Sequence, residues 1–285
     1  MDRPSEKRGK HVDVKHKHHL EEGFRDFIQV YGFNQHTAPG EAEAELAAMS
    51  CHNLLDGVLT TDSDVILFGA KHVIRELPES DGNKRSHQVE IFTEESIRKS
   101  GWDCHRLLLV ALLSGADYDM SGVQGCGIKV ASQLAKGDLG EKLVHAFTGC
   151  PAPQFLRFCV EWRKDLRDML RENAKGALAR KHGNIADNVP NTFPSLSVLG
   201  NYLCPVTSHS LSLDTPRDIG GLRSPQSLQP DVTKLTSLFI HYFNWTPAKV
   251  QKYIHDNIWA GIYMRAIFRV RHNIVFRIWD SQERC

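Results

Sequence analysis

The sequence lacks a hydrophobic run long enough to cross a membrane, because its longest uninterrupted apolar stretch covers only residues 107–113. It also lacks a signal peptide at its start, since residues 1–19 are basic and rich in histidine and contain no apolar segment. None of the seven cysteines stands in a C-x-x-C pair, which argues against a zinc module and for the reduced thiols of a cytosolic or nuclear protein. We therefore expect no membrane partner.

Net charge is also nearly absent, because 35 basic residues balance 34 acidic ones and leave a formal charge of +1. The total charge therefore does not indicate a nucleic-acid partner. Basic residues are concentrated in residues 3–19, where a solvated arm and a set of phosphate contacts are both open readings. The chain has 285 residues, 41% of them hydrophobic, which is enough for one large domain or two small ones.

Hydrophobic periodicity predicts an α/β fold with a largely parallel sheet. Helices are expected over 20–33, 41–55, 93–100, 103–114, 153–182 and, as a final pair, 233–268. Strands are expected over 57–61, 65–69 and 72–76, a polar loop over 78–90, and a linker or exposed loop over 205–232. The aromatic residues Trp245 and Trp259 read as ordinary core residues of the final helical pair.

The first candidate site residues are Glu41 and Glu43, in the first turn of a predicted helix. Acidic residues offset the helix dipole there, so a purely structural role is the plain alternative. Side chains two residues apart on a helix diverge by about 200°. Both glutamates therefore reach one site only if that site lies over the helix N-terminus. Glu45 shares a face with Glu41 and is expected to support the site or to be solvated.

The second pair, Asp62 and Asp64, follows the predicted strand 57–61 at its carboxyl end, where α/β sheets place their sites. On an extended segment these two side chains point the same way, and they would repel each other without a cation between them. A surface turn is the alternative, since aspartate favours turns. The apolar run 65–68 follows immediately, and we interpret the pair as metal-binding.

The third candidate is Asp117, where the apolar helix 103–114 gives way to a glycine-flanked loop, with Asp119 as a weaker candidate. A few residues later, Gly125, Gly127 and Lys129 form a G-x-G turn that enters a helix. Such a turn exposes backbone N–H groups, and a lysine in the first helical turn opposes the dipole. It is therefore more plausible as a phosphate ligand than as a helix stabiliser.

Five carboxylates would be unstable as one dry cluster, and hard cations choose oxygen ligands. The sequence therefore predicts a site for two Mg²⁺ or Mn²⁺ ions, which could activate water and stabilise the leaving oxygen of a phosphodiester. No arrangement of serine or cysteine with histidine stands out, so no covalent intermediate is expected. The predicted ligands are Glu41, Glu43, Asp62, Asp64 and Asp117.

Three stretches, GEAEAE, TTDSDVILFG and LLSGADYDMSGVQGCGIKVA, resemble in this order and spacing the flap endonuclease / XPG (Rad2-like) family of structure-specific nucleases. The branch of fungal Holliday-junction resolvases is the most similar, and the resemblance covers roughly residues 3–268. It implies that the five carboxylates are metal-site residues. It also implies that Gly125, Gly127 and Lys129 belong to a helix–two-turn–helix element, which in the family grips a duplex phosphate backbone through K⁺.

The resemblance also implies a domain plan and a cellular role. A PIN-like nuclease core would span 1–100, the helix–two-turn–helix and following helices 101–204, a linker 205–232 and a helical extension 233–285. The substrate would be branched or flapped DNA, in nuclear repair and recombination, with dimerisation on four-way junctions as a possible mode. Catalysis would be magnesium-dependent hydrolysis of a phosphodiester.

One departure from the family pattern concerns its first strands, which carry two more metal-site aspartates. The segment 3–9 resembles the stretch just after those strands, so the sequence reads as a nuclease core that is incomplete at its N-terminus. We therefore expect weakened catalysis by the chain as written. Two other functions stay open: a non-catalytic DNA-binding remnant of such a nuclease, and a glycosyltransferase that uses the Asp62-x-Asp64 pair. The latter explains neither Glu41 and Glu43 nor the glycine turn.

Overall fold

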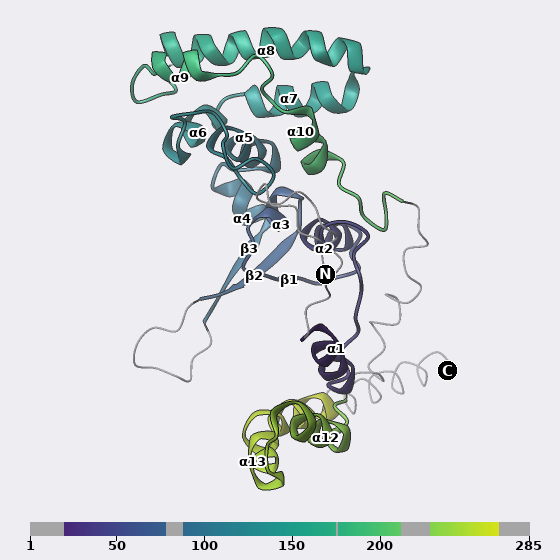
Figure 1. Ribbon diagram of the computed structural model, residues 1–285. Coiled ribbons are helices and arrows are strands. Elements are labelled where there is room, and N and C mark those ends of the chain that lie inside the picture. The colour runs from purple at the N-terminus through teal and green to yellow at the C-terminus, as the bar shows by residue number, and fades with distance from the viewer. Residues whose placement is uncertain (1–19, 78–87, 175, 212–228, 268–285) are drawn as a thin grey trace, which may run out of the picture. The chain divides into compact units, whose positions relative to one another are not determined.

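The computed structural model describes residues 20–77, 88–174, 176–211 and 229–267 (Figure 1). These residues fall into two compact units. The first holds the described residues from Ala38 to Leu211, and the second holds 20–37 together with 229–267. The first unit has two hydrophobic clusters, and the second unit has one.

The first unit contains a three-stranded sheet in the order β1-β2-β3. Strand β1 (Val58–Leu59) pairs in parallel with β2 (His72–Glu76), and β2 pairs in antiparallel fashion with β3 (Val89–Thr93). The described sheet is therefore mixed, with one parallel and one antiparallel pair, where the sequence predicts a largely parallel one.

The sheet has one buried and one open face, as the alternation of side chains along a strand requires. Val58 and Val73 are paired in the register and both are buried. They pack with Ala47 of helix α2 (Ala42–Cys51) and with Val65 of α3 (Asp64–Leu67). On the other face Leu59 is 62% exposed. The α2 and α3 segments therefore cover the inner face, directly beside the predicted acidic motifs.

Two of these elements correct the sequence-based prediction. The apolar run over 65–69 predicts a strand, but Asp64–Leu67 is helical, because the Asp62 carboxylate accepts the N–H of Asp64 at 2.9 Å and starts a turn. Residues 78–87 of the predicted polar loop lie outside the described residues, and Val89, at its predicted end, already pairs with β2. That pairing is a non-local interaction, which local sequence patterns do not encode.

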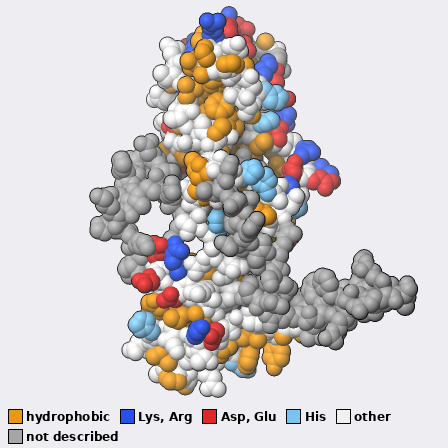
Figure 2. All heavy atoms as spheres, turned by 90° about the vertical axis from the view of Figure 1, so that its right-hand side faces the viewer, with side chains coloured by type: hydrophobic (Ala, Val, Ile, Leu, Met, Phe, Trp, Pro, Cys, Tyr) orange, Lys and Arg blue, Asp and Glu red, His pale blue; other side chains and the backbone are white. Residues whose placement is uncertain are grey.

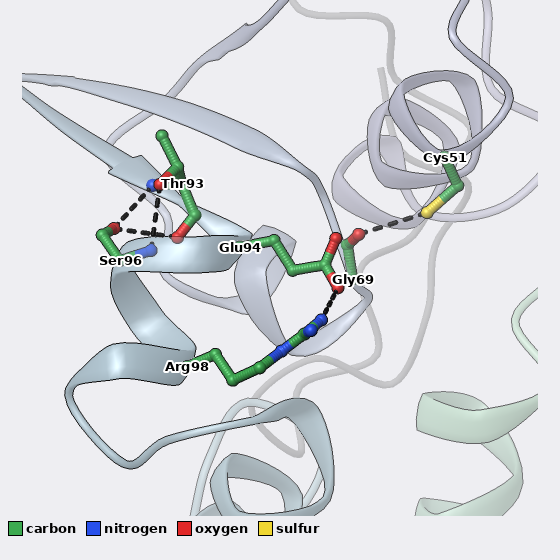
Figure 3. Close-up of polar contacts among 6 residues, drawn as sticks. All are labelled: Cys51, Gly69, Thr93, Glu94, Ser96 and Arg98. Atoms are coloured by element: carbon green, nitrogen blue, oxygen red, sulfur yellow. Dashed lines mark hydrogen bonds and ion pairs between the residues drawn. The ribbon is translucent and has the colours of Figure 1, made fainter.

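Helix α4 (Glu94–Lys99) follows β3 directly, and its start is fixed by reciprocal capping (Figure 3). The Thr93 hydroxyl accepts the N–H of Ser96 at 3.0 Å, and the Ser96 hydroxyl accepts the N–H of Thr93 at 2.9 Å. Glu94 forms an ion pair with Arg98 one turn later. Figure 3 also shows the Cys51 thiol donating to a backbone carbonyl, that of Gly69, which joins the end of α2 to the segment after α3.

The rest of the first unit is helical and surrounds the larger hydrophobic core. Trp162 is fully buried in this core, and its indole N–H donates to the carbonyl of Leu139 at 2.9 Å. The helices are α5 (Cys104–Ser114), α6 (Ile128–Ala135), α7 (Leu139–Gly149), α8 (Ala152–Glu172), α9 (Gly183–Asn188) and α10 (Leu196–Leu203).

The second unit packs α1 (Glu21–Val30) against α12 (Val232–Phe243) and α13 (Pro247–Asn257). The Phe27 and Phe239 rings lie 5.1 Å apart, and Trp245 stacks on Phe239 at 5.0 Å. Trp245 thus joins the core as expected, whereas Trp259 is 42% exposed. The sequence-based plan places residues 20–33 in the nuclease core, but α1 packs with the C-terminal helices.

Hydrophobic side chains also lie on the surface of the second unit (Figure 2). Across the part of the chain that the structure describes, no helix combines the length and apolar character that a membrane crossing needs. The described cysteines are all free thiols.

Candidate metal and nucleic-acid site

The N-terminus of α2 carries three glutamates in three different environments. Glu41 occupies the N-cap position with an extended backbone, and both of its carboxylate oxygens are buried. One carboxylate oxygen of Glu43 is buried as well. Glu45 is fully inside, and it accepts the N–H of Ser208 at 2.7 Å. Glu45 therefore holds the turn around 207–211 onto α2, so of the two expected roles the solvated one does not apply.

That contact also concerns the predicted linker over 205–232. Thr207 and Ser208 are buried, so the segment before residue 212 packs on the first unit. Gly40, just before α2, is needed for this approach, because a Cβ there would come within 2.3 Å of the Val206 carbonyl oxygen. Residues 212–228 of the predicted linker lie outside the described residues.

Asp62 and Asp64 flank the start of α3 rather than lying on one extended segment. One oxygen of the Asp62 carboxylate accepts the N–H of Asp64. The backbone N–H of Asp62 donates to the Thr60 hydroxyl at 3.1 Å. One oxygen of Asp64 is fully buried. A turn at the carboxyl end of β1 therefore fixes the pair. The pair follows the strand as predicted, but its backbone forms a turn and not the predicted extended segment.

Asp117 lies in a tight turn that Gly115 and Gly122 make possible. Gly115 has a φ of +85°, and a Cβ on it would come within 2.5 Å of the Met120 carbonyl oxygen. Asp119, the weaker candidate, accepts the N–H of Ser121 at 3.0 Å and so closes this turn itself. Asp119 therefore has a structural role in this turn.

Tyr202, on α10, is the residue on which these motifs converge. Its hydroxyl is buried, and its ring meets the edge of the Tyr118 ring at 4.7 Å. Burial is the main cause that raises the pKa of Tyr202, and the negative charges of four carboxylates raise this pKa further. These carboxylates belong to Asp64, Asp117, Glu41 and Asp62. Charges act over roughly 10 Å before screening removes them, so four of the five predicted ligands lie within electrostatic range of one hydroxyl.

Among the described residues, these carboxylates do not form a complete metal-coordination shell. Within the described residues, no three His, Cys, Asp or Glu side chains are arranged to hold a metal ion. The donor set still suits a hard divalent cation, because it consists of carboxylate oxygens, several of them buried, and a cation offsets their mutual repulsion. We therefore treat the region as a carboxylate cluster around Tyr202.

The glycine turn before α6 is exposed on the surface. Gly125 has a φ of +85°, Gly127 is the N-cap residue, and Lys129 lies in the first turn of α6. A Cβ on Gly127 would meet nothing within 4 Å, so its backbone is open to an approaching ligand. Between the two glycines, Cys126 is buried, and burial raises the pKa of its thiol to about 11. The turn is therefore anchored from inside and accessible from outside.

The sequence motifs predict the carboxylates as site residues but give no signal for Tyr202, and they leave the role of Glu45 open. Tyr202 is far from the motifs along the chain and carries no local signal, since its partners come from other elements. Glu45 accepts from Ser208, 163 positions away. Only the folded chain brings these residues together.

Comparison with known proteins places this geometry in context. Residues 32–117 match the model of the XPG I-region. The chain is 29% identical over 189 residues to the DNA excision repair protein ERCC-5 homolog of Xenopus laevis, across 66% of this chain and 14% of that protein. It also resembles the eukaryotic junction-resolving enzyme GEN-1 binding with potassium. That structure gives a TM-score of 0.66 at 34% identity, over 81% of this chain and 55% of the other.

A second solved structure is the Holliday junction-resolving enzyme GEN1 in complex with product DNA and Mg²⁺. It gives a TM-score of 0.63 at 33% identity, over 82% of this chain and 55% of the other. The chain thus spans about half of these solved chains and a small part of the Xenopus protein. Fold and acidic motifs together define a PIN-domain nuclease class. Within it, the chain is similar to the XPG/Rad2-like nucleases, whose I-region model matches residues 32–117.

Proposed function

We propose that the chain contributes the catalytic site of a structure-specific DNA endonuclease, which hydrolyses phosphodiesters in flapped or branched DNA. The observation that carries the proposal is a set of carboxylates from three separate stretches, several of them buried, whose charges all act on the Tyr202 hydroxyl. The match of residues 32–117 to the XPG I-region and the likeness of the chain to junction-resolving enzymes support the same function. These comparisons favour a nuclease over the glycosyltransferase alternative.

Glu41, Glu43, Asp62, Asp64 and Asp117 are the proposed ligands of two Mg²⁺ or Mn²⁺ ions. When bound, such ions lower the pKa of a coordinated water and stabilise the leaving oxygen. The chain's own part is to fix the carboxylates. Asp62 is held by its bond to the N–H of Asp64, and Asp117 by the glycine turn at Gly115. The Tyr202 ring makes an edge contact at 4.7 Å with the ring of Tyr118, which follows Asp117 in the chain.

Gly125, Gly127 and Lys129 are the proposed contacts to duplex phosphates, with K⁺ as a further ligand of the same turn. The exposed backbone of Gly127 supports this role. A solved structure of the related enzyme GEN-1 binds potassium, which supports K⁺ as a ligand of this chain. We further propose action in the nucleus and dimerisation on four-way junctions, as the family resemblance implies.

A cleavage assay tests this function directly. The chain is incubated with 5′-flap and four-way-junction DNA in the presence and absence of Mg²⁺. We expect Mg²⁺-dependent cleavage that Asp62→Asn abolishes, because the amide keeps the bond to the N–H of Asp64 but removes the charge. Asp56→Asn is the matched control, since Asp56 is exposed on the approach to β1. Equal cleavage by both variants would refute the proposed site.

A second candidate is DNA binding without cleavage. It is favoured by the lack, within the described residues, of a ready-made group of three metal-binding side chains. The same assay decides between the two candidates: salt-dependent DNA binding with no Mg²⁺-dependent product would select the second.

A further inference from the structure

A second basic surface lies beside the glycine turn and belongs to a different part of the chain. A surface cavity of about 540 Å³ opens between Gly125 and Val130 on one side and residues 180–185 on the other. The segment 180–185 joins the end of α8 to α9, and it contributes Arg180 and Lys181. The sequence motifs give no hint of this cavity, because its two sides are separated by about fifty positions of chain.

The two sides are fixed to each other by specific contacts. The N–H of Ala179 donates to the Gln133 side chain of α6 at 3.2 Å. The Asn188 amide of α9 donates to the carbonyl of Gln124 at 3.2 Å, next to the glycine turn. Ile185 packs below, where a Cβ on Gly125 would come within 3.6 Å of it. The basic segment therefore has a set position relative to the turn, and Figure 1 shows α9 and α6 as neighbours.

The two basic side chains of this cavity, Arg180 and Lys181, take no part in the ion pairs that stabilise the described structure. Two arginines of α8, by contrast, are engaged: Arg167 donates to the carbonyl of Val189 at 2.7 Å, and Arg171 pairs with Asp187 at 2.5 Å. Arg180 and Lys181 are exposed, and among the described residues neither takes part in an ion pair. The described residues that line the cavity include no acidic side chain. Two cations without a counter-charge, facing an open cavity, are suited to an anion.

We propose that Arg180 and Lys181 form a second phosphodiester-binding site, which contacts duplex DNA beside the glycine turn. The choice of DNA as the source of the phosphodiester rests on the proposed function. An arginine offers a planar fork of donors to phosphate oxygens, and a lysine adds a point charge. Together with the backbone of the turn, they let the protein hold neighbouring phosphates of one backbone from two sides.

The test compares two charge-matched double variants of the full chain. Arg180→Gln with Lys181→Gln removes the proposed contacts. Arg157→Gln with Lys164→Gln removes two exposed charges from the outer surface of α8. Affinity for a short blunt duplex is measured between about 50 and 200 mM salt, where the logarithmic slope becomes shallower by about 0.9 for each phosphate that the protein no longer neutralises. A blunt duplex reports backbone binding and does not depend on cleavage.

We expect the Arg180/Lys181 variant to have a slope shallower than that of the control variant by about 1 to 2, with binding weakened about tenfold at low salt. A difference in slope smaller than about 0.9 between the two variants would overturn the proposal. Circular dichroism melts of both variants show whether the fold is kept. Failure of the proposed function looks different, because the unsubstituted chain itself would then fail to bind the duplex or to cleave the flap.

Discussion

The Tyr202 hydroxyl offers a test of the carboxylate cluster that does not depend on catalysis. It is buried, and among the described residues it has no hydrogen-bond partner. It also lies among four carboxylates. Tyr202→Phe keeps the ring and its edge contact with Tyr118 at 4.7 Å, and it removes only the oxygen. The substitution therefore isolates the energetic effect of one polar atom.

The expected magnitude follows from the cost of an unsatisfied buried group. Such a group costs about 1–3 kcal/mol, so the phenylalanine variant should gain about 1 kcal/mol in free energy of unfolding without metal. In a thermal melt, each kcal/mol corresponds to about 2–4 °C for a domain of this size. Urea denaturation followed by circular dichroism measures the same quantity, with the slope as a check on two-state behaviour.

The matched control is Tyr242→Phe in the second unit. The Tyr242 hydroxyl donates to the Asp26 carboxylate at 2.8 Å, so this variant should lose about 0.5–1 kcal/mol rather than gain. Opposite signs for the two substitutions support the description of the cluster. If Tyr202→Phe loses more than about 1 kcal/mol, the hydroxyl has a stabilising role in the fold and our reasoning is wrong.

Two further predictions concern the turns that follow α5. Gly115→Ala should destabilise the fold by about 2–4 kcal/mol, because a φ of +85° and the Met120 carbonyl oxygen both exclude a Cβ. Gly127→Ala, with open space around it, should cost less than about 1 kcal/mol in the same urea assay. Burial raises the pKa of the Cys126 thiol above its ordinary value of 9. The protonated thiol therefore contributes its full stabilisation of the folded state below pH 9. This contribution is lost as the pH rises from 9 to about 11. Cys126→Ala should lack this part of the pH dependence of unfolding, and an unchanged profile would contradict it.

The helices were the most predictable part of the fold. Helix α5 follows from its apolar run and from Asp103, whose carboxylate accepts the N–H of Arg106 at 2.9 Å. Helix α1 follows from apolar spacing and from Gly32, which has a φ of +79° just after it. Local signals of this kind act within a few residues, so a single sequence contains them.

The strand predicted over 65–69 failed for a physical reason. Valine, isoleucine and phenylalanine favour strands, but that preference is weak beside a turn that Asp62 stabilises and an inner face that packs on the sheet. Strand β3 was missed because its evidence lies in pairing with β2. Both errors concern interactions between segments, which periodicity along one segment does not report.

The same distinction divides the candidate site. Glu41, Asp62 and Asp117 could be proposed from their motifs, because acidic residues at element ends are visible in the sequence. The Tyr202 hydroxyl among them, and the cavity beside Arg180 and Lys181, depend on how helices pack. Those features add what the motifs lack: a shared location for the carboxylates and a second basic surface next to the glycine turn.

Binding of Mn²⁺, followed by electron paramagnetic resonance, tests most directly whether the carboxylates hold a divalent cation. The unsubstituted chain should bind Mn²⁺. Asp64→Asn and Asp117→Asn should each weaken binding about tenfold or more, equivalent to about 1.4 kcal/mol, while Asp56→Asn leaves it unchanged. Equal affinity in all four proteins, or no binding by the unsubstituted chain, would contradict the account.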